Sequence, residues 1–521
     1  MKQPAASAPA TLSPGLRRFL YGTAATTGAA ILVVEILGAK MLSPYVGTSH
    51  FVWTAQIAVT LISLAAGYWF GGWLVDRSQN LRRLYTCILL AGLYLCFTVP
   101  FTSKVAFWCL QFPLAVGSLL ASLFLFFVPL TLLATVGPFV IRVLTSVVAG
   151  VGGTVGRLSA ISTLGSVLGT VLIGYVLIPF LPNSTTMFIT AGVLMALAVV
   201  YFLVWREAGD SMGLPLALVV VGVVAGWSGV RADARPPADY MEEVARRNSN
   251  FGLMQVLENV GGSRRYYLND YLTQNTYDPE AKQSVSLFTY GLHGLAGVYT
   301  TQIKDVLCIG MGVGIVPMQF AHEGAKVDVV EINGAVVGVA QAHFDLDPTK
   351  LNLTIGDGRQ FVNAATKQYD AVILDAFLGD SSPSHLMTQE AFTAMRRVLR
   401  PNGVLVINSF GDFDEGKDYF TASLHKTLKS VFGAVRIHAS GNGNVFFVAT
   451  PAKELTQHRT MNFEAMHPTV QQQARDALAG IKDTAPKSGI VLTDDFNPVD
   501  FHDARNREQF RRQLAFSMKP K

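Results

Sequence analysis

VLCIGMGVG, residues 306–314, is the stretch that decides the fold of the C-terminal half. Four apolar residues, typical of a buried strand, run directly into the three glycines Gly310, Gly312 and Gly314. Glycines at this place let the backbone turn sharply, approach a ligand closely and continue into a helix. A lone glycine motif is weak evidence, so its interpretation depends on the residues that follow it.

Short apolar runs alternate with helical stretches throughout this half of the chain. Strands that alternate with helices are typical of a doubly wound, mostly parallel sheet, which predicts a Rossmann-like α/β domain over residues 301–521. The strands are expected at 304–309, 326–331, 351–355, 370–375, 403–408, 433–439 and 444–449, and the helices at 333–343, 358–366, 388–399 and 416–430.

Acidic residues stand at the ends of three successive strands. Glu331 ends the second strand, Asp357 follows the third within GDGR, and Asp375 ends the fourth. Carboxyl ends of parallel strands meet at one edge, where an acid can accept ribose hydroxyls or an adenine amino group. The three glycines are spaced G-x-G-x-G, and no glycine or alanine follows at the spacing that a pyrophosphate loop requires. The sequence therefore predicts an adenosyl ligand in preference to a dinucleotide.

Alternating stretches also precede the α/β region, at 251–258 and 264–272, with two glycines between them. This pattern predicts a small β-hairpin subdomain over 251–300. Residues 231–250 are polar and charged, and we expect a linker with a short helix there.

The N-terminal half is apolar enough for a membrane domain. Residues 1–230 hold 11 Lys and Arg against 4 Asp and Glu, whereas the remaining residues hold 30 and 32. A bilayer-crossing helix needs roughly 20 apolar residues, which predicts an N-terminal tail at 1–18 and about seven helices within 19–230. The candidate spans are 19–43, 51–75, 84–102, 112–141, 159–182, 185–204 and 213–230.

Most of the Lys and Arg residues of this half lie in every second loop, which the positive-inside rule assigns to the cytoplasmic side of the membrane. They follow every second span and also precede the first span, at Arg17 and Arg18. With seven crossings this pattern places the C-terminal half outside the cell. Adenosyl compounds are supplied in the cytoplasm, so we expect an inner-membrane protein with a cytoplasmic domain. This requires that 213–230 does not cross fully, or that 103–141 crosses twice.

Several other site classes are excluded or left open by the sequence. The four cysteines show neither a disulfide framework nor zinc spacing, so no metal is expected. The C-terminal half has no basic stripe for nucleic acid. Glu35 lies within the first span, where an ionisable group is either functional or an interhelical polar contact.

Taken together, the motifs resemble the membrane-fused form of the spermidine synthase (polyamine aminopropyltransferase) family. The C-terminal resemblance lies in LNDYLTQNTYDPE, TYGLH, VLCIGMGVG, VVEIN, IGDGR, YDAVILDAF and LTDDFNP. The N-terminal resemblance lies in PYVGTSHFVWTAQIAVTL, GGWLVDR and GRLSAISTLGSVLGT. It implies an S-adenosylmethionine methyltransferase-like fold and a transferase of polyamine biosynthesis.

The resemblance also implies roles for single residues. Glu331 corresponds to the acid that binds the ribose, and Asp357 with Gly358 to the pair that binds adenine. Asp375 corresponds to the proton acceptor. Gln274 is nearest to the glutamine that contacts the sulfur nucleoside, although Thr273 is closer to the expected register. His293 corresponds to the histidine that precedes the core domain and would bind substrate.

Two acids of the family pattern are missing. Val313 stands where the glycine motif has an aspartate that helps to hold the amine, and Leu378 stands where a second aspartate follows the fourth strand. Asp380 could replace the latter if the loop bends differently. A buried ammonium without a carboxylate is costly, so the acceptor is expected to be less cationic than a diamine, or the donor to be intact S-adenosylmethionine.

Three functions remain open from the sequence. The first is transfer of an aminopropyl-type group from decarboxylated S-adenosylmethionine to a small-molecule amine, with Asp375 as general base. The second is another S-adenosylmethionine-dependent reaction, such as methyl transfer or donor cleavage. The third is a membrane transporter or sensor that only binds nucleoside. The sulfonium would be a co-substrate and not a permanent cofactor, and the expected partners are the lipid bilayer and a second copy in a homo-oligomer.

Overall fold

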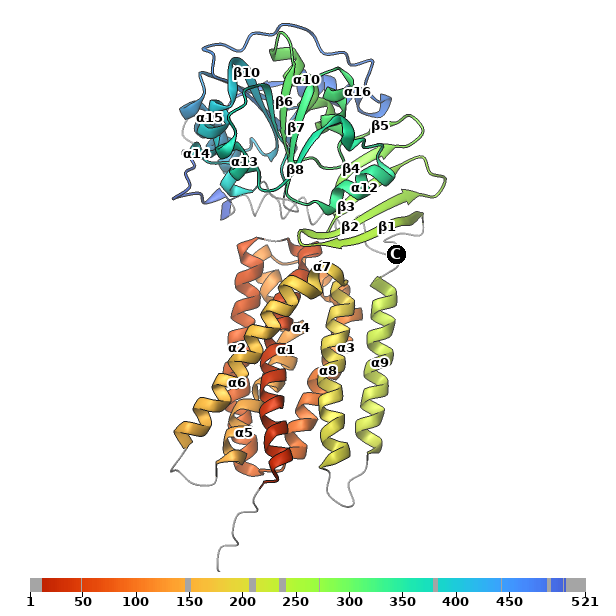
Figure 1. Ribbon diagram of the computed structural model, residues 1–521, viewed down its shortest axis with the longest axis vertical. Coiled ribbons are helices and arrows are strands. Elements are labelled where there is room, and N and C mark those ends of the chain that lie inside the picture. Colours follow the sequence, from red (N-terminus) through yellow and green to blue (C-terminus); the bar gives the residue numbers. More distant parts are fainter. Residues whose placement is uncertain are drawn as a thin grey trace, which may run out of the picture. The chain divides into compact units, whose positions relative to one another are not determined.

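The computed structural model describes residues 12–47, 49–145, 151–205, 212–233, 240–270, 272–377, 383–441, 443–484, 489–499 and 501–502. The chain divides into two compact units, Met1–Arg235 and Pro236–Lys521. Figure 1 shows the helices and strands of both units.

The first unit is helical. Its elements are α1 (Pro14–Val46), α2 (His50–Arg77), α3 (Leu81–Cys109), α4 (Leu114–Ala134), α5 (Val136–Leu144), α6 (Val151–Leu172), the π-helix η1 (Ile173–Leu177), α7 (Ile178–Phe180), α8 (Asn183–Val204) and α9 (Gly213–Asp233). Within the described residues, seven helices are long and apolar enough to cross a membrane, counting α4 with α5 and α6 with η1 and α7 as single helices. The last of them, Gly213–Ala232, is 20 residues long.

Small residues allow α1 and α6 to pack closely. A Cβ on Gly165 would lie 2.1 Å from the carbonyl oxygen of Ala25, and a Cβ on Gly169 would lie 2.6 Å from that of Ala29. The Ser166 hydroxyl donates a hydrogen bond of 3.0 Å to the Gly28 carbonyl. Helix association inside a bilayer depends on such backbone proximity because burial of apolar side chains supplies little driving force there.

The second unit begins with an antiparallel sheet. Its five strands lie in chain order: β1 (Met241–Ser249), β2 (Gly252–Asn259), β3 (Arg265–Asn269), β4 (Leu272–Asp278) and β5 (Gln283–Ser284). The expected hairpin corresponds to β2 and β3. The expected helix before it is wrong, because residues 241–249 form β1 and pair with β2. A charged sequence is tolerated in an edge strand because one side of the strand faces solvent.

An eight-stranded mixed sheet forms the centre of this unit, with strand order β13-β11-β12-β10-β9-β6-β7-β8 (Figure 1). Its strands are β6 (Asp305–Ile309), β7 (Lys326–Glu331), β8 (Asn352–Ile355), β9 (Tyr369–Leu374), β10 (Leu399–Gly411), β11 (Ala434–His438), β12 (Gly443–Thr450) and β13 (Ile481–Lys482). The five from β8 to β10 are parallel, and β12 is antiparallel to both of its neighbours. The sheet is therefore parallel from β8 to β10, on both sides of the strand that leads into the glycine motif. It is antiparallel from β12 to β13.

Helices accompany these strands in sequence. They are α10 (Leu287–Tyr299), α11 (Ile315–His322), α12 (Ala335–His343), α13 (Gly358–Ala364), α14 (Gln389–Arg397), α15 (Tyr419–Val431) and α16 (Pro468–Ala479), with short 3-10 turns η2 (Pro348–Lys350) and η3 (Ser384–Leu386). The sequence pattern did not predict α10, α11 or α16.

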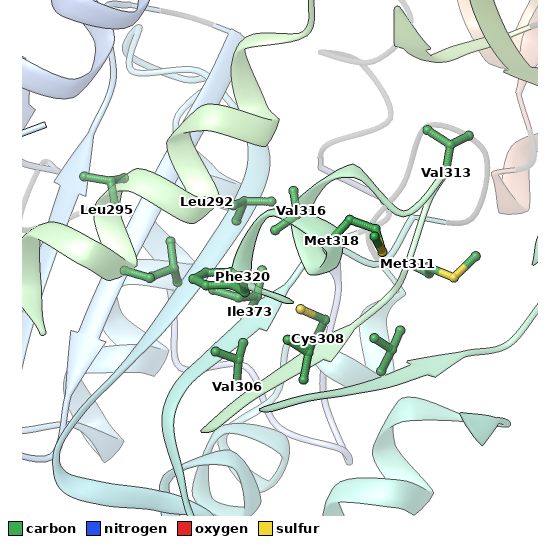
Figure 2. Close-up of a cluster of buried hydrophobic side chains, with 14 of the residues drawn as sticks. Leu292, Leu295, Val306, Cys308, Met311, Val313, Val316, Met318, Phe320 and Ile373 are labelled. Carbon is green, nitrogen blue, oxygen red and sulfur yellow. The ribbon is translucent and has the colours of Figure 1, made fainter. Parts of the chain in front are cut away.

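Two apolar layers cover the faces of the large sheet. Val306 and Cys308 of β6 belong to one cluster, which Figure 2 shows with Phe320 and Ile373, whereas Leu307 belongs to the other. Alternate side chains of a strand point to opposite faces, so β6 is apolar from residue 306 to residue 309 because both of its faces are covered there. This central strand carries the glycine motif at its end.

Candidate functional site

The glycine loop lies where the strand order of the large sheet reverses. The chain proceeds from β6 outward to β7 and β8, and then returns to β9 on the other side of β6. Ligands of open α/β sheets bind at the carboxyl ends of strands at such a reversal. Gly310 and Gly314 have φ values of +91° and +86°, which favour glycine. A Cβ on Gly310 would lie 2.3 Å from the carbonyl oxygen of Asp375.

Glu331, the last residue of β7, faces this loop. Its carboxylate accepts hydrogen bonds from the backbone amides of Met311 at 2.9 Å and Asn333 at 2.7 Å. Burial raises the pKa of Glu331, although the backbone hydrogen bonds act in the opposite direction. The residue is 9% exposed. The acid is therefore anchored beside the glycines, as its expected role at a ribose requires.

Asp375 follows β9 directly and lies deep in the unit with part of its surface open. Its backbone amide donates to the carbonyl of Ile309 at 3.0 Å. Its side chain accepts a hydrogen bond of 2.9 Å from Asn408 Nδ2. Burial, together with the charge of Glu331, raises the pKa of Asp375 to about 6. A carboxyl group with this pKa can accept a proton near neutral pH.

Asn408 was missed by the sequence reasoning. It lies in β10 beside β9, and its side-chain oxygen accepts a hydrogen bond of 3.1 Å from Asn444 Nδ2 of β12. The sequence did contain a signal for it: Asn408 ends the apolar run VLVIN, as the acids end the neighbouring strands. Two asparagines thus orient the carboxyl group of Asp375.

Asp357 is the N-cap of α13. One of its carboxylate oxygens accepts a hydrogen bond of 2.8 Å from the backbone amide of Gln360, and the other lies 3.1 Å from His385 Nε2. A Cβ on Gly358 would lie 2.5 Å from Ile309 Cγ2, so this helix packs tightly on the end of β6. Glu331, Asp357 and Asp375 therefore all stand at the edge that carries the glycine loop.

The small sheet contributes Asn275 to this edge. Asn275 of β4 is 4% exposed, and a Cβ on Gly312 would lie 3.6 Å from its Oδ1. Gln274 precedes it at an irregularity in the pairing of β3 with β4. That irregularity changes which side chains of β4 face the large sheet, and sequence spacing did not reveal it.

His293 is not brought to this edge, and its expected role in substrate binding stays a prediction. Its Nε2 lies 3.0 Å from Glu323 Oε2, and its ring packs against Phe320 of α11. Glu323 precedes β7 by three residues, so the pair lies at the edge where the parallel strands begin. The physical reason is that α10 runs along the sheet and presents His293 to the far end of α11.

Val313 is 1% exposed and belongs to the apolar cluster of Figure 2. The position that carries the family acid is therefore part of the hydrophobic core. Leu378 and Asp380 lie outside the described residues, so the expectation for Asp380 stays a prediction.

Comparison with known proteins agrees with this geometry. Residues 288–440 match the family described as spermine/spermidine synthase domain. The chain is similar to a polyamine aminopropyltransferase of Vibrio vulnificus, with 27% identity over 234 residues that cover 43% of this chain and 77% of that protein. It is also similar to an N-terminal histidine N-methyltransferase of Emericella nidulans, with 29% identity over 215 residues, 37% of this chain and 38% of that protein.

Among solved structures, spermidine synthase from Thermotoga maritima is 17% identical, with a TM-score of 0.37, and the similarity covers 45% of this chain and 84% of that one. The matched family segment contains the glycine loop and all three acids at the sheet edge. The protein is therefore a transferase whose C-terminal part is a spermine/spermidine synthase domain.

Proposed function

We propose that the C-terminal unit transfers an aminopropyl-type group from an adenosyl sulfonium donor to an amine. The observation that carries this proposal is Asp375, a deep carboxyl group with a pKa of about 6 at the end of β9. It lies against the glycine loop, which the family match includes. Aminopropyl transfer is the activity that the family supports, and decarboxylated S-adenosylmethionine is its co-substrate.

Asp375 acts as the general base. The acceptor nitrogen attacks the carbon beside the sulfonium, the carbon–sulfur bond breaks, and the electron pair neutralises the sulfur to a thioether. The acceptor ammonium must lose a proton to become nucleophilic, and Asp375 takes it. A base whose pKa lies just below the working pH is ionised and still accepts a proton readily.

The other residues at the edge hold the nucleoside. Glu331 accepts hydrogen bonds from the ribose hydroxyls. Asp357 with Gly358 binds adenine, and the Asp357 carboxylate accepts a hydrogen bond from the adenine amino group. Gly310, Gly312 and Gly314 let the backbone approach the donor. Gln274 contacts the sulfur end, and Asp380 contacts the acceptor. The buried Val313 supplies no charge, which supports a less cationic acceptor than a diamine.

Methyl transfer from intact S-adenosylmethionine is the second candidate. The similarity to an N-terminal histidine N-methyltransferase favours it. The valine at position 313 also favours it, since an acid there would repel the donor carboxylate. Donor cleavage without an acceptor belongs to the same class of reaction.

Product analysis tests these proposals. The purified protein is incubated with either donor, with and without putrescine, and the products are identified by mass spectrometry. Methylthioadenosine with spermidine supports aminopropyl transfer with putrescine as the acceptor, and methylthioadenosine without spermidine indicates another acceptor or donor cleavage. S-adenosylhomocysteine indicates methyl transfer. Nucleoside binding without any product would leave a nucleoside-sensing or transport role, for which Glu35 is the candidate residue.

We further propose that the helical unit lies in the lipid bilayer of the inner membrane. Its seven long apolar helices support this. A homo-oligomer is part of the same proposal, and light scattering of the detergent-solubilised protein tests it.

A further inference from the structure

The motif LTDDFNP at residues 492–498 is not used by the proposed chemistry, yet it is tied to the sheet edge. The backbone amide of Gln389, the first residue of α14, donates to the Leu492 carbonyl at 2.8 Å. Asn497 Nδ2 donates to the Ser384 carbonyl at 3.0 Å. The motif is therefore bonded to α14 and to the turn before it.

Asp494 makes the central contacts of this motif. Its carboxylate accepts hydrogen bonds from Thr388 Oγ1 at 2.6 Å and from Arg359 Nη2 at 2.9 Å. Thr388 is 1% exposed and caps α14. The Arg359 side chain is 17% exposed. The two donors are largely buried, whereas the Asp494 side chain is 49% exposed, so the position of its carboxylate depends on these two hydrogen bonds.

Arg359 connects Asp494 to the candidate adenine-binding acid. It stands two residues after Asp357 in α13, and its Nη1 donates to the His385 carbonyl at 2.8 Å. The ring of His385 in turn lies 3.1 Å from Asp357 Oδ2, the oxygen that does not accept the Gln360 amide. Residues far apart in sequence thus form a continuous chain of polar contacts that ends on the carboxyl group of Asp357.

Packing alone does not hold this carboxyl group in place. The Asp357 side chain is 36% exposed. A cavity of about 370 Å³ lies beside the network, lined entirely by polar side chains from α13, the turn before α14 and the motif. Because the Asp357 carboxyl group is partly exposed, its position depends on its hydrogen bonds with the Gln360 amide and the His385 ring.

We propose that Asp494 is a positioning residue that holds Arg359 and His385 and thereby sets the selectivity of Asp357 for the amino group of adenine. This inference rests on the proposed role of Asp357 in the nucleoside site. Hydrogen bonds weaken steeply when donor and acceptor are misaligned. A small displacement of α13 therefore reduces the selectivity for the adenine amino group more than it reduces the overall affinity for the nucleoside.

The test compares two nucleosides in binding to the full-length protein in detergent. The probes are 5′-methylthioadenosine and 5′-methylthioinosine, in which oxygen replaces the amino group. We expect the wild type to prefer the former by roughly tenfold or more, the effect of a hydrogen bond to a charged group. Asp494→Asn should reduce the ratio of the two Kd values to within about threefold. The neighbouring exposed Asp495→Asn is the matched control and should keep the wild-type ratio.

Asp494→Glu, which keeps the carboxylate, should restore part of the ratio. Arg359→Lys keeps the charge but loses the planar fork of the guanidinium, and it should lower the ratio of the two Kd values as Asp494→Asn does. This variant tests the proposal if Asp494→Asn does not fold. An unchanged ratio in both variants, or an equal weakening of both probes, overturns the positioning role. A wild type that does not distinguish the probes refutes the proposed adenine contact of Asp357 itself, and the positioning role with it.

Discussion

At the scale of single residues, similar carboxyl groups differ by their surroundings. Glu331 accepts hydrogen bonds from two backbone amides beside the glycine loop. Asp375 accepts a side-chain hydrogen bond from Asn408, and the pKa of its carboxyl is raised to about 6. Burial raises the pKa of both acids, but backbone amides oppose this rise at Glu331, and a side-chain amide, that of Asn408, opposes it at Asp375. Glu331 is suited to binding and Asp375 to proton transfer.

Replacement of Asp375 tests the assigned base. Asp375→Asn should lower product formation by roughly 100-fold or more, the usual contribution of a general base. The Kd for methylthioadenosine should change little, because asparagine has nearly the same shape. Mass spectrometry of products and calorimetry of binding measure the two effects, with Asp495→Asn as the control. Full turnover in the variant would remove Asp375 from the mechanism.

The same residue predicts a pH dependence of stability. Its pKa in the folded protein, about 6, lies above the ordinary value of 3.8, so the folded state binds the proton more tightly than the unfolded state. This contribution is fully present below about pH 4 and is lost as the pH rises through about 6. Asp375→Asn should therefore be more stable than the wild type at pH 8, by up to roughly 3 kcal/mol, with no such advantage at pH 4. Thermal melting at the two pH values measures this, and an equal difference at both would contradict it.

At the scale of elements, the seven strands expected from 304 to 449 correspond to β6–β12. Continuous apolar runs bounded by turn residues are a strong local signal. The charged strand β1 was missed because its pairing with β2 outweighs local preference. The apolar helix α10 was missed because a helix covered by protein on several sides lacks a polar face.

Gly310, in the turn after β6, can be compared with Gly324, which lies between α11 and β7. Gly310 and Gly324 have similar φ values, +91° and +88°, but a Cβ at Gly324 has no neighbour within 4 Å. Gly324→Ala should therefore cost about 1 kcal/mol of backbone strain. Gly310→Ala adds a collision with the backbone of Asp375 and should be clearly less stable and inactive. Melting temperatures and turnover measure the difference, and equal behaviour of the two variants would show that the turn tolerates a side chain.

The contact between α1 and α6 gives a similar test in the helical unit. Gly165 lies against the backbone of Ala25, whereas a Cβ on Gly156 of the same helix would meet nothing within 4 Å. Both alanine variants gain helix propensity. Overpacking should make Gly165→Ala less stable by roughly 1–3 kcal/mol, while Gly156→Ala should be neutral or slightly stabilising. Thermal stability in detergent distinguishes them, and a stabilised Gly165→Ala would refute close packing of the two helices.

At the scale of the whole molecule, two units with different surfaces share one chain. The C-terminal unit buries apolar layers on both faces of a sheet. The helical unit leaves large apolar side chains such as Trp69, Leu168 and Tyr175 exposed, as a lipid-facing surface does.

The side of the membrane is the main prediction at this scale. Because donor compounds are supplied in the cytoplasm, a fluorescent protein fused after residue 521 should fluoresce, and an alkaline phosphatase fused there should be inactive. The last apolar helix is 20 residues long and is sufficient to cross a bilayer. An active phosphatase would place the C-terminal unit outside, as seven crossings and the arginines before the first span imply.

The sequence by itself determined the division into an apolar half and an α/β half, the glycine loop, and the three acids at the strand ends. These features depend on local pattern, since periodicity and turn residues act over a few positions. Only the tertiary structure decided that Asn408 holds Asp375, that Asp494 reaches Arg359, that β4 presents Asn275, and that His293 lies at the opposite edge. These contacts join residues that are distant in sequence, and strand register and helix packing set them, which local pattern does not encode.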